Sequence, residues 1–115
     1  MTDINIATLE EQLRSDDKEM IISALLYGCY NVQSPRWIQE QCVALIDNDK
    51  NLDIQGLAVT CLGHVARMHK AVDWQLIMLY LQCAFQNPEL TGRAQDALGD
   101  IETFVGLKVK LLGAK

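Results

Sequence analysis

The feature of this sequence that most restricts its fold is an internal repeat with a period of about 36 residues. The segment 54–65 (IQGLAVTCLGHV) aligns with the segment 90–101 (LTGRAQDALGDI), which keeps a glycine, an alanine and a Leu-Gly pair in register. A looser copy lies 35 residues earlier, where 26–30 (LYGCY) aligns with 61–65 (CLGHV). Self-similarity at such a period is typical of proteins that stack copies of one structural unit. We therefore expect three such units along the chain.

Each unit is predicted to be a pair of α-helices. Apolar residues recur at spacings of three and four, as on one face of a helix, and no segment alternates as a strand does. A short first helix is marked by Ile6, Leu9 and Leu13. Five further helices are expected over 20–30, 36–46, 54–68, 74–85 and 89–103. The residues expected to cap or open these five helices are, in order, Asp16 or Asp17, Ser34-Pro35, Asp53, Asp73 and Asn87-Pro88.

The predicted fold is an all-α solenoid of three helical hairpins, with six to seven helices in a single domain over 1–115. The repeats are expected at about 5–31, 36–68 and 73–103. The tail 104–115 places apolar residues among lysines and either extends the sixth helix or folds back as a seventh. Although this pattern also suits a lipid surface, we expect the tail to cap the open apolar end of the stack.

Glycines and cysteines recur inside the predicted helices. Gly28, Gly63 and Gly99 share one repeat position, and Gly56 and Gly92 share another. A glycine inside a helix costs about 1 kcal/mol relative to alanine, so we expect neighbouring helices to approach closely at these positions. The four cysteines lie in apolar helical runs without a CxxC pair, and we expect all of them to be buried as small apolar side chains.

The run 94–101 (AQDALGDI) resembles the second helix of a HEAT or armadillo-type repeat, and 58–65 (AVTCLGHV) is the same run with a cysteine in place of an alanine. The resemblance extends over most of the chain and implies a helical solenoid. It does not single out a function, because such solenoids serve as scaffolds, adaptors, lyases and inhibitors.

Composition and charge narrow the classes of function. The chain has 15 acidic and 10 basic residues, giving a net charge of −5, and half of its residues are apolar. Net negative charge disfavours binding to nucleic acid. The sequence shows neither a signal-peptide pattern nor an apolar run long enough to span a membrane. We therefore expect a cytoplasmic protein whose partner is neither a nucleic acid nor a membrane.

In length, charge and architecture such a chain resembles the immunity proteins of bacterial toxin systems, including those of contact-dependent growth inhibition. The resemblance implies non-enzymatic, stoichiometric binding to a cognate toxin, often a basic nuclease, which protects the producing cell. A general cytosolic adaptor is the alternative, and a small HEAT-like lyase is a further one. The sequence leaves the oligomeric state open.

The turns inside the three hairpins are expected to lie on one rim of the stack, which is acidic. We expect this rim to attract a basic partner, because a concentration of one charge speeds association with its opposite. Helix capping explains the same acids without any partner. The candidate binding residues of the acidic rim are Asp16, Asp17, Asp49, Asp53 and Glu89. Turns between hairpins form the opposite, basic rim with Arg36, Arg67, His69 and Lys70.

The second helices of the hairpins are expected to form a concave partner-binding face. Its candidate residues are Thr60, His64 and Arg67 in the middle repeat, Asp96 and Asp100 in the third, and Tyr27 in the first. The aligned apolar residues of the first repeat are Leu25, Cys29 and Val32. They either accept an aromatic anchor of the partner or are hidden by the first helix.

Few residues suit catalysis or metal binding. His64 aligns with Asp100 on the neighbouring helix, and such a pair would suit acid–base chemistry. No nucleophile has an obvious place beside it, so an interhelical hydrogen bond is the expected role of His64. Cys61 and His64 supply at most half of a metal site. We therefore predict no catalytic residue, no bound metal and no cofactor.

Overall fold

The computed structural model describes residues 5–106 and is all-helical over that range, as predicted. Of the helices in this range, none is both long enough and apolar enough to cross a membrane. The expected tail 104–115 lies outside the described residues beyond Gly106. The helices are α1 (Ile6–Leu13), α2 (Lys18–Asn31), α3 (Pro35–Asn48), α4 (Leu52–His69), α5 (Trp74–Gln86) and α6 (Thr91–Val105).

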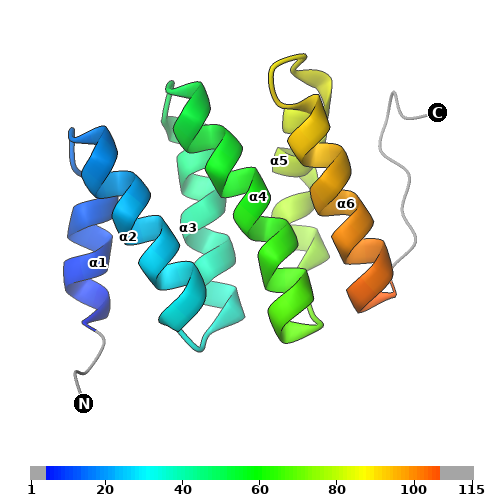
Figure 1. Ribbon diagram of the computed structural model, residues 1–115, viewed down its shortest axis with the longest axis horizontal. Helices are drawn as coiled ribbons and strands as arrows, with labels where there is room; N and C mark the ends of the chain where they lie inside the picture. The colour runs from blue at the N-terminus through cyan, green and yellow to red at the C-terminus, as the bar shows by residue number, and fades with distance from the viewer. Residues whose placement is uncertain (1–4, 107–115) are drawn as a thin grey trace.

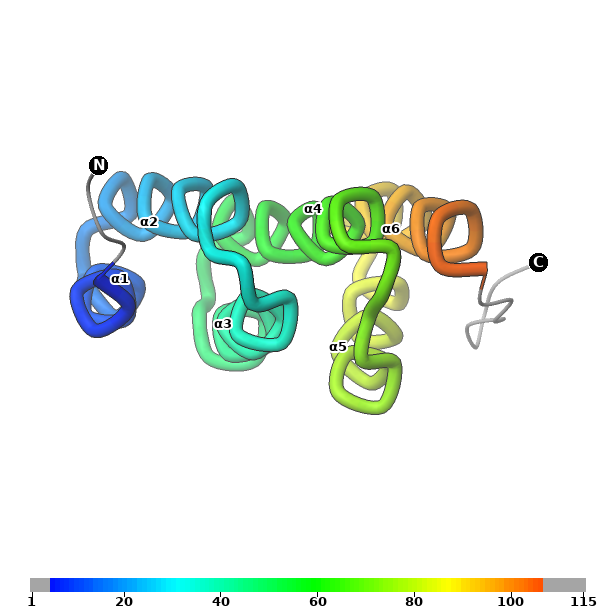
Figure 2. The backbone as a smooth tube through the Cα atoms, turned by 90° about the horizontal axis from the view of Figure 1, so that it is seen from below, coloured from blue at the N-terminus to red at the C-terminus, as the bar shows by residue number. Residues whose placement is uncertain are grey.

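The helices form three consecutive antiparallel pairs that stand side by side (Figure 1). Helices α2, α4 and α6 lie in one layer, and α1, α3 and α5 lie in a second layer behind it (Figure 2). Helix α4 is central, because it packs against α2, α3 and α6. The turns within pairs lie at one edge of the stack and the turns between pairs at the other (Figure 1), so the two rims predicted from the sequence are present.

Polar side chains at the helix starts explain where most helices begin. Asp17 caps α2, Ser34 caps α3 ahead of Pro35, and Asp73 caps α5, as predicted. The prediction that Asp53 caps the fourth helix is wrong. The Asn51 side chain accepts hydrogen bonds from the amides of Asp53 and Ile54 at 2.9 and 3.2 Å, so α4 begins at Leu52 and Asp53 lies in its first turn.

The start of the last helix also differs from the prediction. The expected helix from residue 89 begins at Thr91, because Asn87 to Leu90 form a turn in which the Leu90 amide donates to the Asn87 carbonyl at 2.8 Å. No side chain caps α6. At its other end, Gly106 adopts the left-handed conformation (φ 81°) that glycine accepts readily and that commonly ends a helix.

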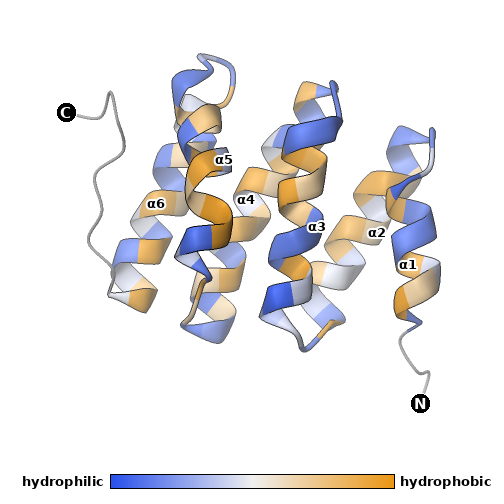
Figure 3. Ribbon diagram, turned by 180° about the vertical axis from the view of Figure 1, so that it is seen from behind, coloured by the Kyte–Doolittle hydropathy of each residue, from blue (hydrophilic) through white to orange (hydrophobic). Residues whose placement is uncertain are grey.

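The core is a continuous cluster of apolar side chains between the two layers. Figure 3 shows orange and blue segments alternating along each helix, as expected when one side packs inward and the other meets water. The largest fully buried side chains are Ile38, Leu62, Ile77, Leu81 and Ile101.

Three of the four cysteines, Cys29, Cys42 and Cys61, are buried in this core, as expected. The prediction is wrong for Cys83, which is exposed on α5. The hydrogen bond with Cys61, followed by burial, raises the pKa of the Cys29 thiol. Cys29 therefore stays protonated and packs as a small apolar side chain.

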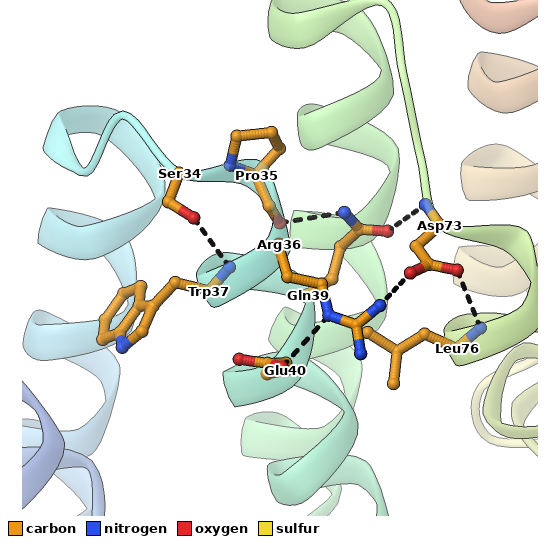
Figure 4. Close-up of polar contacts among 8 residues, drawn as sticks. All are labelled: Ser34, Pro35, Arg36, Trp37, Gln39, Glu40, Asp73 and Leu76. Atoms are coloured by element: carbon orange, nitrogen blue, oxygen red, sulfur yellow. Dashed lines mark hydrogen bonds and ion pairs between the residues drawn. The ribbon is translucent and has the colours of Figure 1, made fainter.

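A buried amide joins the second and third helical pairs (Figure 4). Gln39 is 2% exposed. Its side-chain nitrogen donates to the Pro35 carbonyl at 2.8 Å, and its side-chain oxygen accepts from the Asp73 amide at 2.7 Å. Asp73 also caps α5 and forms an ion pair with Arg36. The Gln39 side chain thereby links the first turn of α3 to the start of α5. Both ends of its amide are hydrogen-bonded, as is usual for a buried polar group.

The repeated glycines serve different purposes in the three pairs. A Cβ added at Gly63 would lie 2.7 Å from the Asp100 carboxylate and 3.0 Å from the Ala97 Cα. A Cβ at Gly56 would lie 2.8 Å from the Arg93 side chain, so α4 and α6 approach closely, as predicted. A Cβ added at Gly28 would instead lie 3.0 Å from the Trp37 ring.

The glycines of α6 do not fulfil the same expectation, because a Cβ added at Gly92 or Gly99 would meet no neighbouring group of residues 5–106 within 4 Å. They occupy the repeat positions of Gly56 and Gly63, but within the described chain no helix follows α6. The same residue at the same repeat position is therefore a packing requirement in α4 and not in α6.

This difference predicts opposite effects of one substitution at two aligned sites. Gly99→Ala should raise the free energy of unfolding by about 0.5–1 kcal/mol, because alanine favours the helix and meets no neighbour. Gly63→Ala should lower it by about 1–3 kcal/mol, because the new methyl group crowds the α6 backbone. Urea unfolding followed by circular dichroism measures both. Equal effects at the two sites would contradict the close packing of α4 on α6.

Candidate functional site

The exposed side of the α2–α4–α6 layer brings together most of the residues predicted for the concave face. We call this surface the α2–α4–α6 face and define it by Lys18 and Tyr30 on α2, Asp53, Thr60, His64 and Arg67 on α4, and Arg93, Asp96 and Asp100 on α6. The α4 members recur at spacings of seven, four and three residues, which places them along one side of the helix. Tyr27 is exposed but lines a groove beside α1, away from this set.

Side chains of neighbouring helices are linked across this face. The Lys18 ammonium lies 2.6 Å from the Asp53 carboxylate, joining α2 to α4. The Arg93 guanidinium donates to the Thr60 hydroxyl at 2.8 Å, and Arg67 forms an ion pair with Asp100, joining α4 to α6. Several of the charges that the sequence offered to a partner are therefore already paired within the molecule.

His64 lies at the centre of the face and does not pair with Asp100. Its ring packs against that of Tyr30 with centroids 4.5 Å apart. Its Nδ1 lies 3.3 Å from a guanidinium nitrogen of Arg67, and Arg67 in turn holds Asp100. The predicted histidine–aspartate pair is wrong, because the arginine lies between the two groups.

Burial, and then the positive charge of Arg67, lower the pKa of His64. The imidazole is therefore neutral at physiological pH. With Arg67 donating to Nδ1, the ring serves as part of the interhelical packing.

The acidic rim is present, but its residues differ in how much charge they leave for a partner. The Asp17 side chain accepts from the Glu19 amide at 3.0 Å, and Asp49 accepts from the Asn51 amide at 2.8 Å. Asp53 is paired with Lys18, and the hydrogen bond from Lys18 lowers the pKa of Asp53. Asp16 and Glu89 are exposed. Asp17 thus caps α2, Asp49 is held in the turn before α4, and Asp16 and Glu89 remain the best placed to meet a partner.

The basic rim is also partly neutralised. Arg36 pairs with both Glu40 and Asp73. The ammonium of Lys70 lies 4.4 Å from the centre of the Phe104 ring, a favourable cation–π contact. Lys70 itself ends α4 in the left-handed conformation (φ 56°).

Of the two alternatives for the apolar residues of the first repeat, burial is the one that the structure confirms. Leu25, Cys29 and Val32, which align with exposed positions of α4, are buried. The exposed large apolar side chains of α2 are Met20, Leu26, Tyr27 and Tyr30. The sequence carried a signal for this, because the segment KEMIISALLYGCYN places apolar residues on every side of the helix. A helix that is apolar all round and not covered on every side leaves apolar side chains exposed to solvent or to a partner.

Within residues 5–106, no three or more His, Cys, Asp or Glu side chains are grouped as a metal ion would require. Cys61 is buried among other thiols and His64 contacts Arg67 and Tyr30. Among the described residues, Cys61 and His64, the two residues whose spacing suggested half of a metal site, therefore do not belong to a group that could hold a metal ion.

Comparison with known proteins identifies one clear structural relative. The chain superposes with a TM-score of 0.77 on a chain in the crystal structure of a CDI complex from Cupriavidus taiwanensis LMG 19424. The two are 27% identical, and the match covers 90% of this chain and 92% of that one. No protein-family model and no curated protein matches the chain. The HEAT or armadillo resemblance therefore stays a prediction, while the all-helical fold is confirmed.

The contact between Arg67 and His64 predicts a titration result. Arg67→Gln should raise the pKa of His64 toward the ordinary value of about 6.5, because it removes a nearby positive charge and releases Asp100. Arg93→Gln is the matched control, because it also removes a positive charge from the α2–α4–α6 face, and Arg93 contacts Thr60 on α4, the helix that carries His64. NMR titration of the imidazole proton signals measures both variants.

The sign of the linked stability effect follows from the lowered pKa of His64. The folded chain binds a proton at His64 less readily than the unfolded chain, so acidification through about pH 6.5 favours unfolding at this residue. A His64 pKa that is unchanged in the Arg67 variant would contradict the contact.

Proposed function

We propose that this chain is an immunity protein that neutralises a cognate bacterial toxin by forming a one-to-one complex with it. The observation that carries the proposal is its likeness to a chain of a CDI complex over nearly the full length of both chains. CDI stands for contact-dependent growth inhibition, the system that the length, charge and helical repeats of this sequence had already suggested. A sequence identity of 27% accompanies the shared fold.

Of the two members of such a complex, the charge of this chain suits the inhibitor better than the toxin. The net charge is −5, and the acidic rim keeps Asp16 and Glu89 exposed. A toxin that acts on nucleic acid is expected to be basic, and an acidic inhibitor would attract it at long range. The proposed partner is therefore a basic toxin domain, and a nuclease is its most specific form.

The surface also favours binding over catalysis. On the α2–α4–α6 face, His64 contacts Arg67 and Tyr30 and has no carboxylate partner. The exposed tyrosines of α2 are side chains of the kind that dominate binding energy when a partner buries them. We therefore propose inhibition by occlusion, in which the inhibitor covers the toxin and performs no chemistry on it.

The first test is to identify and reconstitute the complex. Affinity capture from the source cells at low and at high salt, read by mass spectrometry, should return one basic protein in one-to-one ratio. Expression of that protein alone should arrest growth, and co-expression of this chain should restore it. Several neutral or acidic partners would support the adaptor alternative, and growth that is not restored would contradict neutralisation.

A second test addresses the acidic rim. Asp16→Lys and Glu89→Lys should each lower the association rate with the basic partner by about threefold to tenfold at low salt, because long-range attraction is lost. The effect should largely disappear at high salt, where charges are screened. Surface plasmon resonance measures the rates, and circular dichroism confirms that helicity is kept.

Glu102→Lys is the matched control for both rim variants, because Glu102 is exposed on α6 and the change in charge is the same. An equal fall in association rate for all three variants would indicate a general effect of net charge. No fall for the rim variants would show that the acidic rim does not steer the partner.

A further inference from the structure

Helix α2 exposes apolar side chains on the side turned away from the rest of the stack. Its other sides pack against α1, α3 and α4. Met20 and Tyr27 are 42% and 44% exposed and lie seven residues apart, which is two helical turns. Both side chains keep a large exposed part and line the same groove, and exposed apolar surface that gathers in one place marks interaction sites.

These side chains line a groove between α1 and α2 at the N-terminal end of the stack. Its volume is about 610 Å³, within the range of pockets that take large apolar groups. Leu9 and Ala24, both buried, belong to its lining, and Met20 and Tyr27 are its exposed apolar members. Helix α1 has 8 residues and α2 has 14, so α1 is too short to cover α2 along its length.

The charge at the groove is negative. Asp17 and Glu19 line it, and among residues 5–106 no lysine or arginine belongs to its lining. The nearest basic residue in sequence, Lys18, is held 2.6 Å from Asp53 on α4, on the α2–α4–α6 face. The Asp17 and Glu19 carboxylates at the groove complement a cationic group that stands beside an apolar one.

We propose that this groove accepts an apolar side chain of the partner protein together with an adjacent lysine or arginine. The proposal rests on the proposed function and adds to it the place and the chemistry of an anchor. A buried apolar anchor with a charge pair at its edge is the usual composition of the residues that dominate a protein interface. The acidic rim would guide the partner, and the groove would hold it.

A synthetic peptide with a leucine between two lysines tests the groove without the partner. In NMR titrations of the full chain, the Met20 methyl signal and the amide signals of Ser23 and Tyr27 should shift with this peptide. A control peptide with glutamates in place of the lysines should leave them unchanged. Absence of shifts, or equal shifts with both peptides, would overturn the proposal.

Variants of the chain test the same groove against the toxin identified by capture. Tyr27→Ala should weaken binding by about tenfold to thirtyfold, and Glu19→Lys by about tenfold. Leu79→Ala and Glu102→Lys are matched controls, because Leu79 is 62% exposed and both residues lie at the other end of the stack. The two controls should keep the affinity of the unmodified chain, and circular dichroism checks that all four variants fold.

The outcomes separate the two proposals. If the unmodified chain neutralises no toxin, the proposed function fails, and the peptide titration still reports on the groove. If the unmodified chain neutralises a toxin and the Tyr27 and Glu19 variants bind it with unchanged affinity, the groove proposal alone fails. Concentration-dependent dimerisation that Tyr27→Ala abolishes would show that a second copy occupies the groove and would also overturn it.

Discussion

The close packing of α4 on α6 is the contact on which the exposed layer depends. Gly56 and Gly63 remove two side chains from α4, and the space they leave is taken by Arg93 and by Asp100 with the Ala97 backbone. A Cβ at either site would force these groups to move. The approach therefore fixes where the α6 side chains lie, and the contacts of Arg93 with Thr60 and of Asp100 with Arg67 follow from it.

The surface that results is organised by its internal pairs. Exposed ion pairs such as that of Lys18 and Asp53 contribute little to stability, because water screens both groups. Their effect here is on what remains available to a partner. On the α2–α4–α6 face Lys18 pairs with Asp53 and Arg67 with Asp100. Asp16, Glu19 and Glu89 on the acidic side, Asp96 on the face and several apolar side chains of α2 are exposed. The parts that suit a basic, partly apolar partner thus lie at the acidic rim and the N-terminal end.

The ends of the stack explain why one repeat yields three environments. A unit in the middle of a stack has neighbours on both sides, whereas a terminal unit has one open side. Gly63 contacts the next helix of its layer, Gly28 accommodates Trp37, and a Cβ added at Gly99 would meet no neighbour among residues 5–106. Helix α2 has the short α1 as its pair partner at the N-terminal end, so its outward apolar side chains stay exposed. The groove that we propose for the partner lies where the repetition stops.

The sequence by itself determined the helices, their pairing and the two rims. Helix periodicity, capping residues and a repeat of about 36 residues are local or one-dimensional signals, and they placed Ser34, Asp17 and Asp73 correctly as caps. The cap predicted at Asp53 was wrong by only two residues. Asn51, the residue that does cap α4, has a side chain of similar shape that also accepts hydrogen bonds.

Only the tertiary structure decided which side chains are exposed and which are paired with one another. Alignment to α4 left Leu25, Cys29 and Val32 either exposed to a partner or hidden, and the packing of α2 at the end of the stack buries them and exposes Met20, Tyr27 and Tyr30. It also placed Arg67 between His64 and Asp100. A repeat states which positions are equivalent along the chain, but exposure and pairing depend on the neighbours each copy has in space, and these differ between the middle of a stack and its ends.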